Sequence, residues 1–314
     1  MNKKLIADIG GTNIRLAISQ NNRFCFIQKL QCADFNSLED AILFYYEQHN
    51  IDPKDVQNGA ICVACPVLSD KVSLTNCHWK FSIKELKKNI KFKHLSVVND
   101  FVAQALAIPF LPKTDLVQIK SGTVANSQTV GVIGPGTGLG TAILLQDNPF
   151  PKVIACEGGH VSISANNDKE AKIISLAWQE MGHISAEKLL SGLGLPNLHK
   201  VLKNFYGLPI EKIDAAEIFK RAQNQDSFCQ EVLDLFFSLF GTFCSNFALS
   251  CGCTDGLYIA GGIFANQENL EMLKKSNFTK SFLDKGRFEG YLSQIPIYVV
   301  THANPALIGL DKLA

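Results

Sequence analysis

The 314-residue sequence lacks any long run of basic or acidic residues. Its 30 lysines and arginines balance 29 aspartates and glutamates, so the formal net charge is only +1. Proteins that hold nucleic acid or anionic membranes by charge usually carry a basic patch or tail. The even balance therefore argues against nucleic-acid and membrane partners, and the absence of low-complexity segments argues against a disordered chain.

Signal-peptide and membrane-span patterns are also lacking. The apolar run that starts at Leu5 is cut by Asp8, far short of a signal h-region. Segment 235–251 is apolar, but serine and asparagine residues interrupt it, so a buried helix is the preferred interpretation. We therefore expect a cytoplasmic protein.

The ten cysteines do not form the framework of a secreted protein. The CxxC pair Cys62 and Cys65 lies in a strand-like run that ends at Pro66, where alternation would place the two thiols on opposite faces or in an unfavourable kink. No second pair lies nearby. We expect buried, reduced thiols rather than a redox or zinc site.

The pattern of elements predicts an α/β protein of two domains. Strands alternate with helices along the chain, and Pro109 and Pro112 mark the expected boundary. Strands are expected at 5–9, 14–19, 60–64, 95–98, 129–133, 141–145, 257–263 and 297–300. Helices are expected from residue 38, at 82–89, 101–108, 168–181, 185–190, 214–223 and 228–250, and at the C-terminus.

Two glycine-rich segments share one pattern, a strand, a glycine loop and a second strand. They read IADIGGTNIRLAI at 6–18 and VGVIGPGTGLGTAIL at 130–144. A dinucleotide-binding loop would lead into a helix, and the GxxxxGK[ST] spacing of a P-loop is missing. Two glycine hairpins, one per domain, are the arrangement of an actin-like ATPase clamp.

Each loop has a functional and a structural interpretation. Glycines let backbone amides approach a phosphate closely, and Asp8 before the first loop could hold Mg²⁺ through water. Segments 10–13 and 134–140 could instead be a plain hairpin turn and a mobile surface hairpin. The pairing of the two loops favours phosphate binding.

Two further constellations carry polar side chains. Asp100, after Asn99, stands where a strand is expected to meet a helix, which suits a general base but also a helix cap. Glu157 and His160 of EGGH, with Glu187 further along, could accept hydrogen bonds from the hydroxyls of a polyol. Glu187 alone would also suit the first turn of a helix. A metal site is less favoured, because HExxH and a second histidine at ligand spacing are absent.

Together these motifs resemble the bacterial glucokinase family, within the hexokinase and actin-like ATPase superfamily. The matching pieces run in order over nearly the whole chain. They are Asp8–Thr12, CVACPV at 62–67, LTNCHWKFSIKELKKN at 74–89, NDF at 99–101, GTGLG at 136–140, EGGHV at 157–161, GHISAEKLLSG at 182–192, IAGGI at 259–263, DKGRF at 284–288 and NPALIG at 304–309.

The resemblance implies a two-domain actin-like ATPase (ribonuclease H-like) fold of the hexokinase type. It implies a small α/β domain from 1–110 plus 298–314, a large α+β domain from 111–297, and an active site in the cleft between them. It also implies a homodimer.

The implied activity is transfer of the ATP γ-phosphoryl group to the 6-hydroxyl of glucose, giving glucose 6-phosphate and ADP at the entry to glycolysis. Asp100 is the implied catalytic base, and Mg²⁺ is held by Asp8 through water. The implied sugar contacts are Asn99, Asp100, Glu157, His160 and Glu187. The implied nucleotide contacts are Ala7, Asp8, Ile9, Gly10, Gly11, Thr12, Gly136, Thr137, Gly138, Gly261 and Gly262.

Some positions depart from the family pattern. Ala7 replaces a common glycine, Pro135 replaces a small residue, and Cys244-Ser245 stands where a glycine pair is usual. These changes leave the sugar site untouched and bear on nucleotide binding.

Three alternatives remain. A kinase for fructose or mannose would share the same motifs. A non-catalytic sugar-sensing regulator would need a DNA-binding segment before the loop at residue 8 and a cysteine-rich zinc motif, for which Cys251-Gly-Cys253 is too little. An inactive sugar-binding relative would lack some of the polar residues that are present here. An enzyme is therefore preferred.

Overall fold

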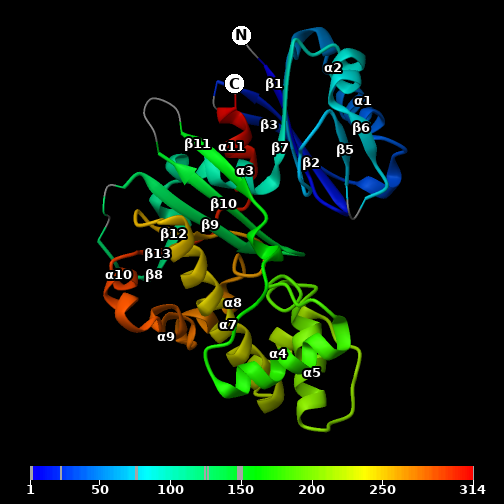
Figure 1. Cartoon of the computed structure of the whole chain (residues 1–314). Coiled ribbons are helices and arrows are strands. Elements are labelled where there is room, and N and C mark those ends of the chain that lie inside the picture. The colour runs from blue at the N-terminus through cyan, green and yellow to red at the C-terminus, as the bar shows by residue number, and fades with distance from the viewer. Residues whose placement is uncertain are drawn as a thin grey trace. The chain divides into compact units, whose positions relative to one another are not determined.

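A computed structural model of the chain describes residues 3–21, 23–74, 77–123, 125, 127–146 and 151–313, and it divides into two compact units (Figure 1). Unit 1 comprises residues 1–111 and 304–314, and unit 2 comprises residues 112–303. The expected second division at 297/298 falls inside a strand of unit 2, so residues 298–303 belong to that unit. Thr75 and Asn76 of the motif at 74–89 lie outside the described residues.

Unit 1 is built on a five-stranded sheet in the order β3-β2-β1-β4-β7. Strands β1, β4 and β7 are parallel, whereas β2 and β3 add to the sheet as antiparallel strands. A separate two-stranded sheet pairs β5 with β6. The bounds are β1 Lys4–Ile9, β2 Asn13–Gln20, β3 Arg23–Gln31, β4 Asn58–Val63, β5 Lys71–Ser73, β6 Lys80–Ser82 and β7 His94–Asn99.

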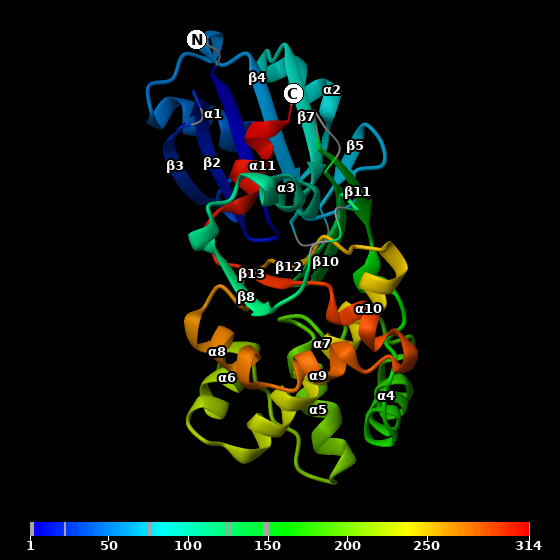
Figure 2. The ribbon, with the colours of Figure 1, turned by 90° about the vertical axis from the view of Figure 1, so that its left-hand side faces the viewer.

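Helices cover both faces of this sheet, which explains why β1 and β4 are mostly apolar. Helices α1 (Leu38–Gln48) and α2 (Ile83–Ile90) pack on one face, and α3 (Asp100–Ala107) and α11 (Pro305–Lys312) pack on the other. In Figure 2, α3 and α11 lie side by side. Their close contact requires Gly309, because a Cβ there would lie 1.8 Å from the carbonyl oxygen of Ala103.

Unit 2 contains a six-stranded sheet in the order β11-β10-β9-β12-β13-β8. Strands β9, β12 and β13 are parallel, and β10, β11 and β8 run antiparallel to their neighbours. The bounds are β8 Leu116–Lys120, β9 Thr129–Pro135, β10 Leu139–Leu145, β11 Lys152–Cys156, β12 Leu257–Ile259 and β13 Ile297–Val300.

The core of unit 2 forms around helix α7 (Ser227–Cys251). By length and composition this helix could cross a membrane, but 78% of its most apolar window is buried within the protein. Burial by neighbouring helices is what a core helix requires, as the sequence predicts. Those neighbours are α4 Asp168–Met181, α5 Leu195–Phe205, α6 Ala215–Gln223, α8 Gln267–Lys275, α9 Phe278–Leu283 and α10 Glu289–Ser293.

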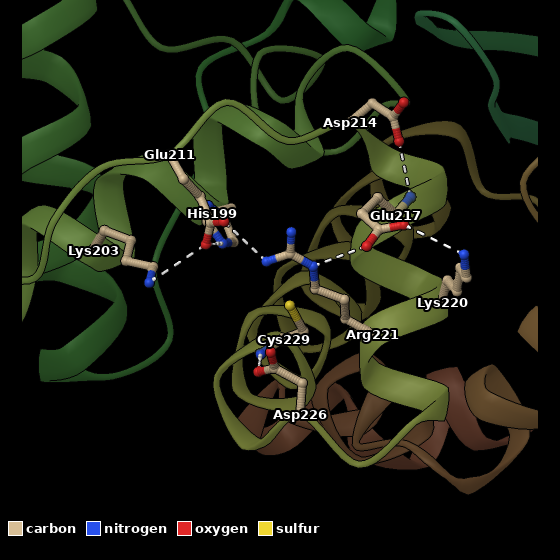
Figure 3. A network of polar contacts seen from close by, with 9 residues as sticks. All are labelled: His199, Lys203, Glu211, Asp214, Glu217, Lys220, Arg221, Asp226 and Cys229. Atoms are coloured by element: carbon tan, nitrogen blue, oxygen red, sulfur yellow. Dashed lines mark hydrogen bonds and ion pairs between the residues drawn. The ribbon is translucent and has the colours of Figure 1, made fainter.

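A polar network joins α5, α6 and the start of α7 (Figure 3). Arg221 donates hydrogen bonds to Glu217 and to Glu211, and Glu211 also lies 3.6 Å from the ammonium of Lys203. His199 is buried, with its ring edge-to-face against Phe228. Neither ring nitrogen of His199 has a hydrogen-bond partner within the described part of the chain.

Several predicted elements differ from the structure. The predicted helix at 185–190 is wrong: this segment forms turns, because the backbone amides of Ala186 and Glu187 donate to Val161 and Gly159 instead of to helix carbonyls. Helix α5 and the outer strands β3 and β11 are present but were not predicted. The strand expected at 257–263 ends at Ile259.

Candidate active site

Polar residues lie at the carboxyl ends of β1 and β7, the parallel strands on either side of β4. Asp8 on β1 pairs in register with Cys62 on β4, and Cys62 pairs with Val98 on β7. One position further, Val63 pairs with Asn99, and Asp100 follows at the start of α3. Ligand sites in α/β sheets lie outside the carboxyl ends of the strands. This edge of the sheet therefore brings Asp8, Asn99 and Asp100 together.

The carboxylate of Asp8 is held from two sides. The Cys62 thiol donates to Oδ1 at 3.3 Å, and the Arg15 guanidinium donates to Oδ2 at 3.3 Å. Burial raises the pKa of Asp8, while the Cys62 hydrogen bond and the Arg15 charge oppose that rise. The pKa of Cys62 is raised by its own burial and by the charges of Asp8 and Asp100, which places this thiol near both carboxylates.

Asn99 caps helix α3. Its Oδ1 accepts from the backbone N–H of Phe101 at 2.8 Å, and its Nδ2 donates to the carbonyl of Cys65 at 3.4 Å. Oδ1 of Asp100 also accepts from the Phe101 N–H, at 3.0 Å. The helix-cap interpretation is correct for Asn99, and it fixes the Asp100 carboxylate at the helix start, as a general base requires.

The first glycine loop is a tight turn between β1 and β2. The N–H of Gly10 donates to the carbonyl of Asn13 at 2.9 Å. Gly11 and Thr12 lie at the tip, and Thr12 is exposed. The side chains of Ala7 and Ile9 are buried in the core, so a nucleotide could meet these two residues only through their backbone.

The second glycine loop is shorter than predicted. Strands β9 and β10 stay paired up to Pro135 and Leu139, which leaves Gly136, Thr137 and Gly138 as the turn. The N–H of Gly192 donates to the Gly136 carbonyl at 2.7 Å and so braces the turn. The sequence alone does not reveal this role of Gly192, since only the folded chain brings it to the hairpin.

Gly261 lies against the end of β9. Its φ of +105° is one that residues with side chains rarely adopt, and a Cβ there would lie 2.9 Å from the carbonyl oxygen of Pro135. Gly262 has open space where its Cβ would be. The predicted nucleotide residues Gly261 and Gly136–Gly138 therefore come from neighbouring strands of one sheet.

Glu187 connects the glycine turn to the EGGH segment. Its Oε2 accepts from the backbone N–H of Leu139 at 2.8 Å, and its own N–H donates to the Gly159 carbonyl at 2.9 Å. A Cβ at Gly138 would lie 2.4 Å from Glu187 Oε2, so a larger residue there would require the Glu187 carboxylate to move. Glu187 thus contacts both predicted binding segments of unit 2.

Glu157 directly precedes a short 3-10 turn, Gly158–His160, and His160 is its last residue. Their side chains are 53% and 61% exposed, and Nε2 of His160 lies 3.8 Å from Oε2 of Glu157. Both side chains are therefore accessible to solvent, and their role as sugar contacts stays a prediction.

Thr141 fixes the EGGH segment and was not predicted. This buried residue on β10 accepts from the Gly158 N–H at 2.9 Å, and its hydroxyl donates to the Cys156 carbonyl at 3.3 Å. A threonine among the apolar residues 139–145 carries no signal that distinguishes this role.

Metal binding is best supported at Asp8. No group of three or more histidine, cysteine or acidic side chains in the described ranges is arranged to hold a metal ion. Cys62 and Cys65 belong to different apolar clusters on opposite faces of the sheet, one of the two arrangements that the sequence predicts. A single partly exposed carboxylate suits Mg²⁺, which keeps several waters.

Unit 1 carries carboxylates at parallel strand ends, and each unit carries a glycine hairpin. These features define a phosphotransferase of the hexokinase type with an actin-like ATPase fold. The glucokinase family model matches residues 5–314. The chain belongs to the glucokinase family. The predicted family, fold class and enzyme class are thereby confirmed.

Individual relatives agree with this assignment. Curated glucokinases from Escherichia fergusonii and Pectobacterium atrosepticum are each 40% identical, over 97% of this chain and 94% of theirs. A crystal structure of glucokinase from an Antarctic psychrotroph superposes with a TM-score of 0.87 and 34% identity, covering 99% of this chain and 98% of that one. A glucokinase from Streptomyces griseus, solved with glucose and AMPPNP, has a TM-score of 0.67 at 17% identity and shares the fold, covering 100% and 99% of the two chains.

Proposed function

We propose that the protein is a glucokinase that transfers the γ-phosphoryl group of ATP to the 6-hydroxyl of glucose. The observation that carries the proposal is the convergence of Asp8, Asn99 and Asp100 at the carboxyl ends of β1 and β7, the two parallel strands on either side of β4. Glucokinases that are 34–40% identical over nearly the whole chain support glucose as the acceptor. The AMPPNP complex of the Streptomyces griseus glucokinase supports ATP as the donor.

Asp100 acts as the base in this proposal. Phosphoryl transfer depends mainly on alignment and charge stabilisation, so the base must be held in position more than it must be strongly basic. The capping of α3 by Asn99 and the Phe101 N–H hold the Asp100 carboxylate at the helix start. There it orients the sugar 6-hydroxyl and accepts its proton as the O–P bond forms.

Asp8 would hold Mg²⁺ through water, and the ion would neutralise charge on the ATP phosphates. The Cys62 thiol and Arg15 keep the Asp8 carboxylate oriented before any ligand binds. The amides of the two glycine turns, at Gly10–Thr12 and Gly136–Gly138, would approach the phosphates closely.

The sugar contacts are assigned to both units. Asn99 and Asp100 come from unit 1, and Glu157, His160 and Glu187 come from unit 2. A site that pairs each substrate hydroxyl with a polar group can reject analogues lacking that hydroxyl by about 10⁴–10⁵. We further propose a cytoplasmic homodimer.

A coupled assay of ADP release, run with ATP and separate hexoses, tests the proposal. The result expected is a kcat/KM for glucose well above those for fructose and mannose. A higher value for either of these would identify a different hexose kinase. Tight glucose binding without ADP release would identify a sugar-sensing regulator instead.

A further inference from the structure

Two thiols of unit 1 meet beside the first glycine turn. Cys32 begins a short 3-10 turn (Cys32–Asp34) directly after β3, and its thiol interacts electrostatically with the thiol of Cys77. Both are free cysteines; Cys32 is buried and Cys77 is half-buried. The two residues are 45 positions apart in sequence, so only the fold brings them together.

Hydrogen bonds to Phe35 hold the segment that follows Cys77 against the segment that follows Cys32. The carbonyl of Phe35 accepts from the indole N–H of the buried Trp79 at 3.1 Å, and it lies 3.0 Å from Nε2 of His78. These two residues directly follow Cys77. The thiol pair is therefore part of a packed structure, with Cys77 giving access from solvent.

Cys32 also contacts the predicted phosphate loop. Its backbone N–H donates to the Thr12 carbonyl at 2.9 Å, and its thiol donates to the Gly10 carbonyl at 3.9 Å. Burial, together with the neighbouring Cys77, raises the pKa of Cys32 to about 12. Cys32 is thus a protonated thiol at neutral pH, and its hydrogen supports the loop.

We infer that Cys32 and Cys77 form a reversible oxidation site, which closes to a disulfide in response to a peroxide and weakens ATP binding. The sulfur of Cys77 attacks the peroxide, so that an S–O bond forms, the O–O bond breaks and hydroxide leaves. The sulfur of Cys32 then attacks this sulfenic acid, and its proton leaves with the oxygen as water. Overall, two thiols lose two electrons and two protons, and one peroxide becomes two waters. A dithiol reductant reverses the reaction.

Weaker ATP binding is expected because the disulfide removes the thiol hydrogen of Cys32. A disulfide sulfur cannot donate, so the Gly10 carbonyl loses its thiol donor and the turn at Gly10–Thr12 loses part of its support. The loss of one weak hydrogen bond predicts an increase in the KM for ATP of about three- to tenfold. The KM for glucose should change less, because Cys32 contacts none of the proposed sugar residues in the described structure.

Mass spectrometry of the full chain tests the disulfide directly. Trypsin can release Cys32 on peptide 30–54 and Cys77 on peptide 72–80, each with no other cysteine. After hydrogen peroxide treatment and alkylation of the remaining thiols, the two peptides should appear joined, and dithiothreitol should separate them. Oxidation of Cys77 to the sulfinic acid without a joined peptide would overturn the inference.

Kinetics with matched variants test the consequence. In the C77A variant, and independently in the C32A variant, the KM for ATP should be insensitive to peroxide. The control variant C25S removes an exposed thiol of the same unit, and it should respond to peroxide as the unaltered protein does. A joined peptide with an unchanged KM for ATP would also overturn the inference. The consequence rests on the proposed kinase function, whose own failure would appear separately, as no ADP release from the fully reduced protein.

Discussion

In unit 1 the carboxylates of Asp8 and Asp100, to which we assign roles in the proposed site, stand at the ends of parallel strands, next to the buried thiol of Cys62. In unit 2 the side chains of Glu157 and His160 are more than half exposed, and they stand on a loop. Unit 1 thus positions its groups by sheet register, whereas unit 2 positions them by loop hydrogen bonds. Mutations should therefore act differently in the two units, through chemistry in the first and through loop geometry in the second.

The largest effect should come from unit 1. D100A removes the proposed base. Because a general base contributes a factor of about 10²–10⁴ to the rate, kcat should fall by about that factor, whereas glucose binding should survive in part. Steady-state kinetics and glucose titration measure the two effects. D34A, which removes an exposed carboxylate of the same unit, is the control and should retain normal kcat. Near-normal turnover of D100A would end the assignment of Asp100 as base.

A slightly smaller effect is expected from G138A in unit 2. The new Cβ would lie 2.4 Å from Glu187 Oε2, so the Glu187–Leu139 hydrogen bond must break or the turn must shift. Losing a hydrogen bond to a charged group costs about 1.5–3 kcal/mol, which predicts a drop in kcat/KM of about tenfold to a hundredfold. G290A, where a Cβ meets open space, is the matched control. Equal kinetics for both variants would show that Glu187 does not support the turn.

The T141V variant should show whether the position of the EGGH segment affects glucose binding more than it affects the rate of phosphoryl transfer. Valine cannot accept from the Gly158 N–H or donate to the Cys156 carbonyl, so the free energy of unfolding should fall by about 1–3 kcal/mol. The KM for glucose should rise, with kcat changed less. Urea unfolding and kinetics measure both effects, with T129V on the neighbouring strand as control. A normal KM for glucose in T141V would contradict the role given to this hydroxyl.

The smallest effect concerns the pH dependence of stability. The pKa of His199 is lowered, mainly by burial. The positive charges of Lys203 and Arg221 lower this pKa further, and the negative charges of Glu211 and Asp226 oppose the change (Figure 3). The unfolded state therefore binds a proton more readily, and stability should decrease as the pH falls from about 6.5 through the lowered folded-state pKa. H199F should weaken this decrease in urea-unfolding midpoints measured between pH 7 and 5. A steeper loss of stability with falling pH in H199F than in the unaltered protein would contradict the predicted contribution of His199.

The same contrast between units explains what the sequence could predict. Asp8 and Asn99 end two strands, β1 and β7, that lie on either side of β4. Strands with apolar patterns are visible in sequence, so the grouping of these residues at one edge of the sheet was predictable. Residues 185–190 resemble a helix start, but their amides pair with the EGGH segment, which no local pattern reveals. The helical spacing of Leu195, Leu198 and Leu202 was present, but it was not recognised.

Sites that depend on long-range contacts were the hardest to predict. Thr141 and Gly192 act through partners 17 and 56 residues away, at Gly158 and Gly136. The strands β3 and β11 lie at sheet edges, where exposed faces weaken the apolar pattern. Glu187 was chosen as a sugar contact, but its hydrogen bond to Leu139 could come only from the fold.

A crystal structure with glucose and a non-hydrolysable ATP analogue tests the central claim most directly. The account predicts that the Asp100 carboxylate lies within hydrogen-bond distance, about 2.6–3.2 Å, of the glucose 6-hydroxyl. Glucose bound with its 6-hydroxyl facing some other group, and Asp100 remote from every sugar oxygen, would contradict it.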